Sequence, residues 1–296
     1  MTLTARLLDA VWPRHCLGCE RELAAAREVD SPRTGAAAAG GGACARRPQR
    51  GRSIFEGPPL GLCPDCQGRL VEIDAASSCA TCARPLATGA YPASQRCGEC
   101  LADPPPFERL TALWRYESPL KEVVQAFKFG RLDYLGNHFA RELARIFRER
   151  RRDEAGWDPP ELFIPVPLPW PRRLMRGFNQ TELVAWPLGR QLERPCRRAL
   201  ARRFFARRQL GQSRVGRELA RHFFVPRTKD VRGYTILLLD DVVTTGATLR
   251  AAGVALREAG ARRIEAAVLG WTPPDAPFEG APGGPKRAST RGLAGL

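Results

Sequence analysis

The stretch ILLLDDVVTTGATL, residues 236–249, constrains the fold more than any other part of the sequence. Together with Tyr234 and Thr235 it gives a near-continuous apolar run of strand length, which is typical of a central strand in a parallel sheet. The segment that follows, residues 246–260, spaces its apolar residues as a helix does and ends at Gly260. A strand that passes directly into a helix predicts an α/β fold whose ligands bind at the carboxyl end of the strand.

Strands and helices are predicted to alternate through residues 107–272. The segment 109–116 is expected to be an edge strand, and Pro187 is expected to kink or interrupt its helix. The predicted strands are 109–116, 161–168, 234–241 and 262–272, and the predicted helices are 119–130, 134–150, 179–194 and 246–260. This alternation predicts a parallel sheet with flanking helices on both faces.

The residues after the predicted central strand suit a sugar phosphate. Backbone N–H groups at a helix N-terminus, together with threonine hydroxyls, bind phosphate, and glycine lets the backbone approach it closely. Carboxylates repel phosphate, so Asp240 and Asp241 are expected to hold sugar hydroxyls or a bridging Mg²⁺. The predicted phosphate loop contains Thr244, Thr245, Gly246, Ala247 and Thr248. The chain lacks G-K-[ST] and G-x-G-x-x-G at this place, which disfavours nucleoside triphosphate hydrolysis of the P-loop type.

A second polar segment, IPVPLPWPRRLMRGFNQTELVA, occupies residues 164–185. Its position and charge suit a loop on the pyrophosphate side, in which the arginines are predicted to meet a diphosphate and Gly177 permits a turn. Two alternatives remain. The arginines could be a solvated patch, and Asn179 with Glu182 resembles a helix-capping box. The candidate diphosphate ligands are Arg172, Arg173 and Arg176.

Eight of the ten cysteines form four C-x-x-C pairs. Two such pairs make a closed tetrahedral thiolate site, which is typical of structural zinc, so eight cysteines predict two Zn²⁺ ions. Sequential pairing gives one site from Cys16, Cys19, Cys63 and Cys66, and another from Cys79, Cys82, Cys97 and Cys100. An interleaved pairing stays open. A disulfide framework needs an oxidising compartment, of which the chain carries no signal.

The composition divides the chain into three parts. A double zinc ribbon is predicted at 12–101, with a disordered insertion at about 25–57, and the α/β domain is predicted at 107–272. A flexible tail is predicted at 273–296. No apolar run is long enough to span a bilayer, and the chain is expected to be cytoplasmic.

The formal net charge is +16, with 47 basic against 31 acidic residues. This balance favours a polyanionic partner, although arginine-rich composition alone could also produce it. Residues 190–232 carry 14 basic and three acidic residues, with Phe204 and Phe205 among the arginines. Such a mixture is typical of single-stranded nucleic-acid binding, and a solvated amphipathic helix is the alternative. The candidate contacts are Arg202, Arg203, Arg207 and Arg208.

The stretch at 236–249 resembles the phosphoribosyl-pyrophosphate (PRPP) loop of type I phosphoribosyltransferases. The cysteine-rich N-terminal part, the R-R-x-x-R-G-F-N-Q segment and the KFGRLDYLG segment at 128–136 add a resemblance to the ComF/GntX family. That resemblance implies PRPP or ribose 5-phosphate with Mg²⁺ as ligands. It also implies a role in natural transformation, with single-stranded DNA and other DNA-uptake proteins as partners. Whether the chain catalyses transfer to a nucleobase, or senses PRPP without chemistry, stays open, because the Gln209–Arg217 region lacks the asparagine usual in the family.

Overall fold

The computed structural model describes residues 14–23, 59–86, 96–130, 132–202, 224–226 and 228–273. The predicted insertion, and the predicted tail apart from Pro273, lie outside these residues. The strands are β1 (Arg109–Arg115), β2 (Leu162–Pro165), β3 (Leu200–Arg202), β4 (Phe224–Pro226), β5 (Thr235–Val243) and β6 (Arg263–Trp271). The helices are η1 (Pro59–Gly61), α2 (Pro64–Gln67), α3 (Gly98–Ala102), α4 (Leu120–Phe129), α5 (Tyr134–Asp153), α6 (Trp170–Arg176), α7 (Gln180–Gln191), α9 (Thr228–Val231) and α10 (Ala247–Glu258).

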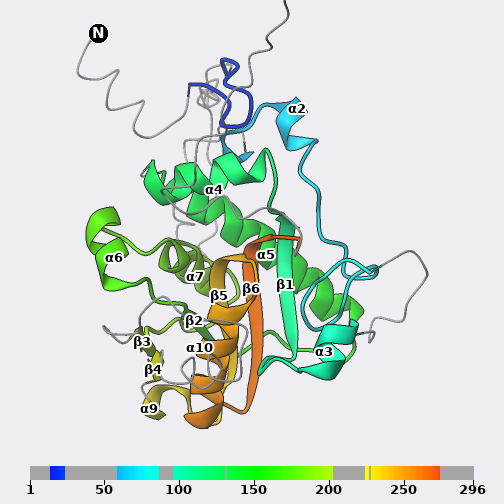
Figure 1. Ribbon diagram of the computed structural model, residues 1–296, viewed down its shortest axis with the longest axis vertical. Coiled ribbons are helices and arrows are strands. Elements are labelled where there is room, and N and C mark those ends of the chain that lie inside the picture. The colour runs from blue at the N-terminus through cyan, green and yellow to red at the C-terminus, as the bar shows by residue number, and fades with distance from the viewer. Residues whose placement is uncertain are drawn as a thin grey trace, which may run out of the picture.

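The main sheet has four strands in the order β1-β6-β5-β2, and every neighbouring pair is parallel. This confirms the predicted fold class, with β1 at an edge and β5 inside the sheet. A separate antiparallel pair joins β3 to β4. Parallel neighbours place the carboxyl ends of β2 and β5 at the same edge of the sheet (Figure 1).

Helices cover both faces of the sheet because the side chains of β5 alternate between them. Leu237 and Leu239 pack with α4, α5 and α7 in one apolar cluster. Ile236 and Leu238 pack with α10 in the other. A continuous apolar run in the sequence therefore becomes a strand that is buried on both sides.

Two differences from the predictions bear on the candidate site. β5 does not end at the aspartates but continues to Val243, which pairs with Trp271 of β6, whereas β2 stops at the level of Leu239. The second is α6, a helix of seven residues at a place predicted to be a loop. Both differences shape the candidate site, because they shorten the phosphate loop and mount the arginines on a helix.

Pro187 does not interrupt α7, which is continuous from Gln180 to Gln191. A proline has no N–H to donate to the carbonyl four residues earlier, which is that of Leu183. Gly136 of α5 packs directly against this carbonyl, and a Cβ at Gly136 would overlap the Leu183 oxygen. The Leu183 carbonyl, which Pro187 leaves without its helical hydrogen bond, is thus covered by the close approach of α5 at Gly136.

The cysteine-rich segments lie at the two ends of β1, with α2 near α4 and α3 leading into the start of the strand (Figure 1). Backbone bonds tie the segment after α2 to β1, including Ile73 N–H to the Leu113 carbonyl at 3.1 Å. Among the described helices, none combines the length and apolar character required to cross a membrane.

Candidate functional site

The carboxylates of Asp240 and Asp241, here called the acid pair, lie just past the end of β2. Asp241 is only 14% exposed and meets the Lys128 ammonium of α4 at 3.1 Å. Gln180, the first residue of α7, donates from its amide nitrogen to the same Oδ2 atom. The other oxygen of Asp241 accepts from the Val242 N–H at 2.6 Å. Asp241 is therefore a fixed carboxylate that three elements of the fold position.

The two aspartates differ in ionisation. Burial, reinforced by the neighbouring Asp241 charge, raises the pKa of Asp240 to about 7. Burial also acts to raise the pKa of Asp241, but the Lys128 charge and the Gln180 hydrogen bond outweigh it and hold that pKa below the ordinary value. The site therefore pairs a permanent anion with a carboxyl group that exchanges a proton near neutral pH.

Arg202 of β3 lies in the electrostatic field of the acid pair. Burial lowers the pKa of Arg202 to about 10, while the charge of Asp240 opposes that shift. The sequence predicts Arg202 as a nucleic-acid contact, and the structure places its charge near Asp240, which is predicted to hold ribose hydroxyls. Arg203, Arg207 and Arg208 lie outside the described residues, as do Gln209 and Arg217.

The residues after β5 form a short turn into α10. Thr244 and Thr245 are exposed, and Gly246 adopts a left-handed conformation with φ of 71°. The Thr245 hydroxyl accepts from the Ala247 N–H at 3.4 Å, and Thr248 lies in the first turn of the helix. Residues 244–248, here called the threonine loop, thus present hydroxyls and N–H groups at the N-terminus of a 12-residue helix. Such an arrangement binds anions.

The predicted diphosphate arginines lie on α6. Arg172 is exposed, whereas Arg173 is 3.8 Å from Glu182. Arg176 lies over the Phe129 ring at 4.6 Å and donates to the Gln180 side chain at 3.1 Å. Burial lowers the pKa of Arg176, and the Asp241 charge opposes this shift. Arg176 is therefore the arginine of α6 that is linked to the acid pair.

Gly177 is the C-cap of α6, and Asn179 is the N-cap of α7. Gly177 has φ of 79° and terminates α6 in the left-handed conformation. Asn179 is buried and caps α7 by accepting from the Thr181 N–H, which agrees with the capping alternative. Glu182 is engaged by Arg198 at 2.6 Å. These contacts give the segment between α6 and α7 a fixed geometry.

Two residues of the site are missed by sequence reasoning. Neither Lys128 nor Gln180 is predicted as a site residue, although both belong to segments that resemble the family's motifs. The signal that could have found Lys128 is a lysine in the last turn of an amphipathic helix. A carboxylate partner on a distant strand cannot be read from that position alone.

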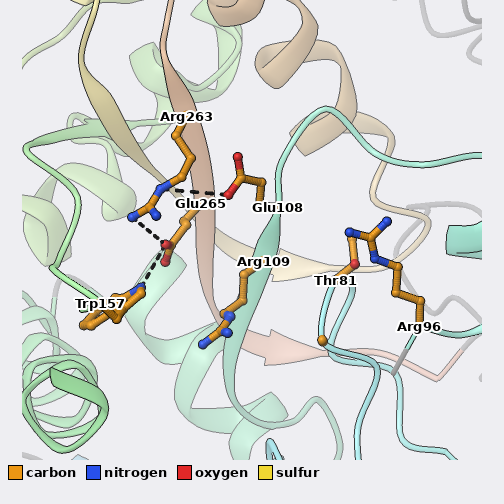
Figure 2. Close-up of a pocket in the computed structure, with 8 residues that line it drawn as sticks. Thr81, Arg96, Glu108, Arg109, Trp157, Arg263 and Glu265 are labelled. Atoms are coloured by element: carbon orange, nitrogen blue, oxygen red, sulfur yellow. Dashed lines mark hydrogen bonds and ion pairs between the residues drawn. The ribbon is translucent and has the colours of Figure 1, made fainter. Parts of the chain in front are cut away.

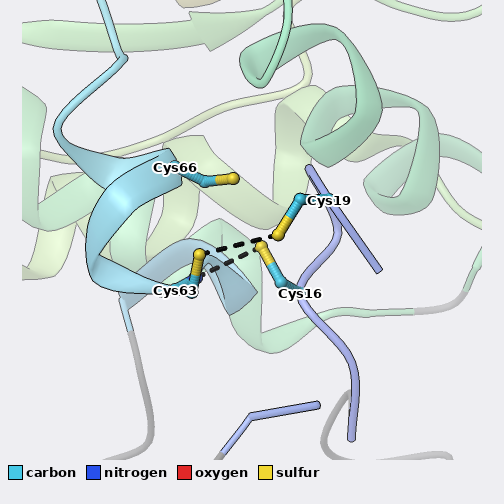
Figure 3. A group of neighbouring side chains, drawn as sticks. All are labelled: Cys16, Cys19, Cys63 and Cys66. Carbon is cyan, nitrogen blue, oxygen red and sulfur yellow. Dashed lines mark hydrogen bonds between the residues drawn. The ribbon is translucent and has the colours of Figure 1, made fainter. Parts of the chain in front are cut away.

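The eight C-x-x-C cysteines form two groups in the sequential arrangement, with the sulfur atoms of each group within 4.8 Å of one another. Figure 3 shows the first group converging from two segments. The Sγ atoms of Cys19 and Cys63 are 3.7 Å apart, and those of Cys82 and Cys97 are 3.6 Å apart. A tetrahedral Zn²⁺ with Zn–S bonds of about 2.3 Å separates its sulfurs by about 3.8 Å, so both groups fit this ion.

An equivalent hydrogen bond from a backbone N–H reaches one sulfur in each group. The Cys63 N–H donates to the Cys16 sulfur at 3.2 Å, and the Cys97 N–H donates to the Cys79 sulfur at 3.2 Å. Such bonds stabilise thiolates and orient them toward an ion. Four sulfurs fill a tetrahedral ion and leave no position for a substrate, so a bound metal would be structural.

Asparagine at position 240 is expected to stabilise the fold more at pH 8 than at pH 4. The folded pKa of Asp240 is about 7 against an ordinary value of 3.8, and an acid with a raised folded pKa loses stability as the pH rises between these values. The advantage of Asp240→Asn over the wild type should therefore grow between about pH 4 and pH 7 and then level off. Urea unfolding at several pH values measures it.

Asp241→Asn is the matched control, because the folded pKa of Asp241 is lowered. A carboxylate with a lowered pKa contributes stability above its unfolded pKa and loses that contribution as the pH falls through its folded value. The asparagine variant should therefore be less stable than the wild type near neutral pH. Parallel pH profiles for the two variants would contradict the difference in ionisation.

The sequence matches the family described as "Phosphoribosyl transferase domain" over residues 178–277, which include the acid pair and the threonine loop. It is 31% identical to "Competence protein F" of Haemophilus influenzae over 209 residues, covering 69% of this chain and 88% of the relative. It is 32% identical to "DNA utilization protein YhgH" of Escherichia coli K12, with the same two coverages. It is 28% identical to "Competence protein ComFC" of Bacillus subtilis, over 69% of this chain and 80% of the relative.

Proposed function

Because the chain belongs to the family of competence protein F and DNA utilization protein YhgH, we propose that it binds PRPP or ribose 5-phosphate at the acid pair and the threonine loop. We propose further that it acts in the uptake and handling of single-stranded DNA during natural transformation. The observation that best supports this ligand is the position of the acid pair, shortly before an exposed threonine loop at the carboxyl edge of a parallel sheet.

Each part of the ligand has a matching group in the site. The acid pair holds the ribose hydroxyls together with Mg²⁺, which would neutralise the diphosphate. The N–H groups and hydroxyls of residues 244–248 hold the 5′-phosphate. Arg172, Arg173 and Arg176 hold the diphosphate, with Arg176 already placed beside the acid pair by Phe129 and Gln180.

Lys128 has a defined part in this proposal. Its ammonium group lies 3.1 Å from Asp241 and helps to keep that carboxylate ionised and in place. Mg²⁺ held by the acid pair would supply positive charge at the same carboxylate, and Lys128 would then be available to the diphosphate.

An active phosphoribosyltransferase is the second candidate. It is favoured by the fixed charge of Asp241, since an oxocarbenium-like transition state at the ribose is stabilised by a positioned anion. Release of pyrophosphate in the presence of a nucleobase identifies the enzyme. PRPP binding without pyrophosphate release across a panel of nucleobases identifies a non-catalytic sensor.

The DNA part of the proposal is supported by charge and by exposed rings beside the site. Phe129 is 60% exposed and Trp170 is 57% exposed, and Arg172 is exposed on the same short helix as Trp170. Aromatic side chains stack on unpaired bases, and arginines neutralise the phosphates between them. Arg203, Arg207 and Arg208, which lie outside the described residues, stay predicted contacts for the same nucleic acid.

Trp170→Ala is expected to weaken binding of a fluorescein-labelled oligothymidine by about 1–3 kcal/mol, because it removes one stacking platform. Arg172→Ala should weaken binding and lower the slope of log affinity against log salt by about 1. Fluorescence anisotropy across a salt series measures both. Trp186→Ala is the control, since Trp186 is 42% exposed but lies on α7. Equal losses at Trp170 and Trp186 would argue against a DNA surface at α6.

A further inference from the structure

We propose that a second ligand site lies between the second cysteine group and the sheet, and that it binds a small phosphate monoester carrying hydroxyl or amino donors. The site is a cavity of about 220 Å³, here called the junction cavity (Figure 2). Its sheet wall includes Arg109, the first residue of β1, and Arg263, the first residue of β6. The acid pair follows the opposite, carboxyl end of the sheet, so the two sites are separate.

The two walls of the junction cavity come from different parts of the chain. Thr81 lies inside the C-x-x-C turn between Cys79 and Cys82, and Arg96 directly precedes Cys97. Figure 2 shows these two side chains on one side and the charged residues of β1 and β6 on the other. A ligand in the cavity would therefore connect the second cysteine group to the sheet.

Three buried polar atoms at the cavity residues have no hydrogen-bond partner among the described residues. They are the Thr81 hydroxyl, the Arg263 Nε and the Glu265 Oε2. Thr81 is 4% exposed and Glu265 is 3% exposed, so bulk water has little access to form hydrogen bonds with them. Buried polar groups are nearly always paired, so three together at one cavity indicate a missing partner.

The charges around the cavity indicate what that partner is. Arg96 makes no ion pair with the cavity residues drawn in Figure 2, although its guanidinium group lines the cavity. Arg263 meets Glu265 through a terminal guanidinium nitrogen at 3.2 Å, and its Nε lies 3.9 Å from Glu108, which is too far for a hydrogen bond. Arg96, Arg263 and the Thr81 hydroxyl therefore supply donors from opposite walls. A tetrahedral phosphate presents oxygens in both directions, whereas a planar carboxylate presents its two oxygens to one side.

The acceptor at the cavity requires a donor on the ligand. Glu265 Oε1 accepts from the Trp157 indole at 3.1 Å, while Oε2 has only Arg150 nearby, at 3.8 Å. Inorganic phosphate could reach this oxygen only with its own O–H group, which would bring the rest of the anion close to the two carboxylates of the wall, and they would repel it. A hydroxyl or amino group on the far end of a phosphate ester supplies the bond. The cavity therefore selects a ligand that carries both kinds of group.

Binding of glycerol 3-phosphate to the zinc-loaded full chain tests this site, with inorganic phosphate as the comparison. Both titrations use the Gly246→Val protein, whose threonine loop is expected not to bind phosphate, so that the proposed PRPP site does not contribute and its success or failure is measured separately. Glycerol 3-phosphate is expected to bind more tightly than inorganic phosphate and to slow hydrogen exchange around Thr81 and Arg96. Arg96→Ala is expected to weaken this binding roughly tenfold or more, because a charged donor is lost.

Arg232→Ala is the matched control, since Arg232 is an exposed arginine outside the cavity. It should bind glycerol 3-phosphate as its parent does. Thr81→Val adds a second variant, which removes only the hydroxyl and should also weaken binding while the melting temperature is kept. Three results each overturn the proposal: no binding, equal affinity for the two probes, or binding that Arg96→Ala leaves unchanged.

Discussion

Replacing Cys66 by serine is expected to destabilise the α/β fold as a whole, whereas replacing Cys100 is expected to loosen only the second cysteine group. Cys16, Cys63 and Cys66 belong to the same apolar cluster as Leu120 and Phe127 of α4. The second group packs apart from it, with Leu86 as its apolar neighbour. Loss of the first metal site therefore opens the main core, and loss of the second does not.

The magnitudes support a large difference. A structural zinc site contributes on the order of 10–16 kcal/mol in small zinc domains, which equals or exceeds the roughly 5–15 kcal/mol that holds a typical domain folded. Cys66→Ser should therefore lower the melting temperature of the sheet and its helices by tens of degrees or abolish folding. Cys100→Ser should leave that transition in place and expose amides near Cys79 and Cys97. Thermal unfolding and hydrogen exchange measure the two effects.

Cys196→Ser is the matched control. Cys196 is buried but lies outside both cysteine groups, so the substitution tests the loss of a buried thiol without the loss of a metal ligand. We expect it to destabilise the protein by roughly 1–3 kcal/mol. Equal effects of Cys66→Ser and Cys100→Ser would show that the first group is not part of the main core.

Replacing Gly246 by valine is expected to abolish binding of ribose 5-phosphate and PRPP. Gly246 has φ of 71°, where a β-branched residue is strained, and it is the N-cap of α10. A valine would move the loop and place a side chain where phosphate meets the backbone N–H groups. Each charged hydrogen bond contributes about 1.5–3 kcal/mol, so loss of two would weaken binding roughly a hundredfold or more.

The control for backbone strain is Gly233→Val. Gly233 has φ of 79° and open space around its Cβ position, but it lies at the opposite end of β5 from the threonine loop. Both variants should lose similar stability, and only Gly246→Val should lose the ligand. Ligand-induced shifts of the melting temperature distinguish them. Retained binding by a folded Gly246→Val protein would exclude the threonine loop as the phosphate site.

The central strand, the threonine loop and α10 could be predicted because their signals are local. The run at 236–239 has strand length and no polar interruption, and Gly246 precedes a segment with helical spacing. The four C-x-x-C pairs are equally local signals, but the sequence left both the sequential and an interleaved arrangement open, and the structure shows the sequential one. The resemblance to the ComF/GntX family could be recognised because its motifs are continuous in sequence, and the relatives confirm it.

The length of β5 could not be predicted because its neighbour decides it. Val242 and Val243 stay in the strand because β6 continues alongside them, to Gly270 and Trp271. Sequence reasoning ended the strand at the charged Asp241 instead. Pairing between distant segments overrides the local polarity.

The sequence did not predict the helix α6, because prolines lie at its start. Prolines disfavour a helix interior, but Pro171 occupies the first turn of α6, where its missing N–H has no intrahelical partner to lose. The ion pair of Lys128 with Asp241 and the electrostatic effect of Asp240 on Arg202 join residues that are far apart in the sequence, so they depend on the fold. The motifs locate the site, and the fold supplies these partners.

Calorimetric titration of PRPP with Mg²⁺ into the zinc-loaded protein tests the proposed ligand most directly. The wild type is expected to bind with saturable heat, and the folded Asp240→Asn/Asp241→Asn variant is expected to lose that binding, because the ribose hydroxyls and the metal lose their carboxylates. Thermal unfolding of both proteins verifies that each is folded. Absence of binding by the folded wild type, or equal binding by the variant, would contradict a sugar-phosphate site at the acid pair.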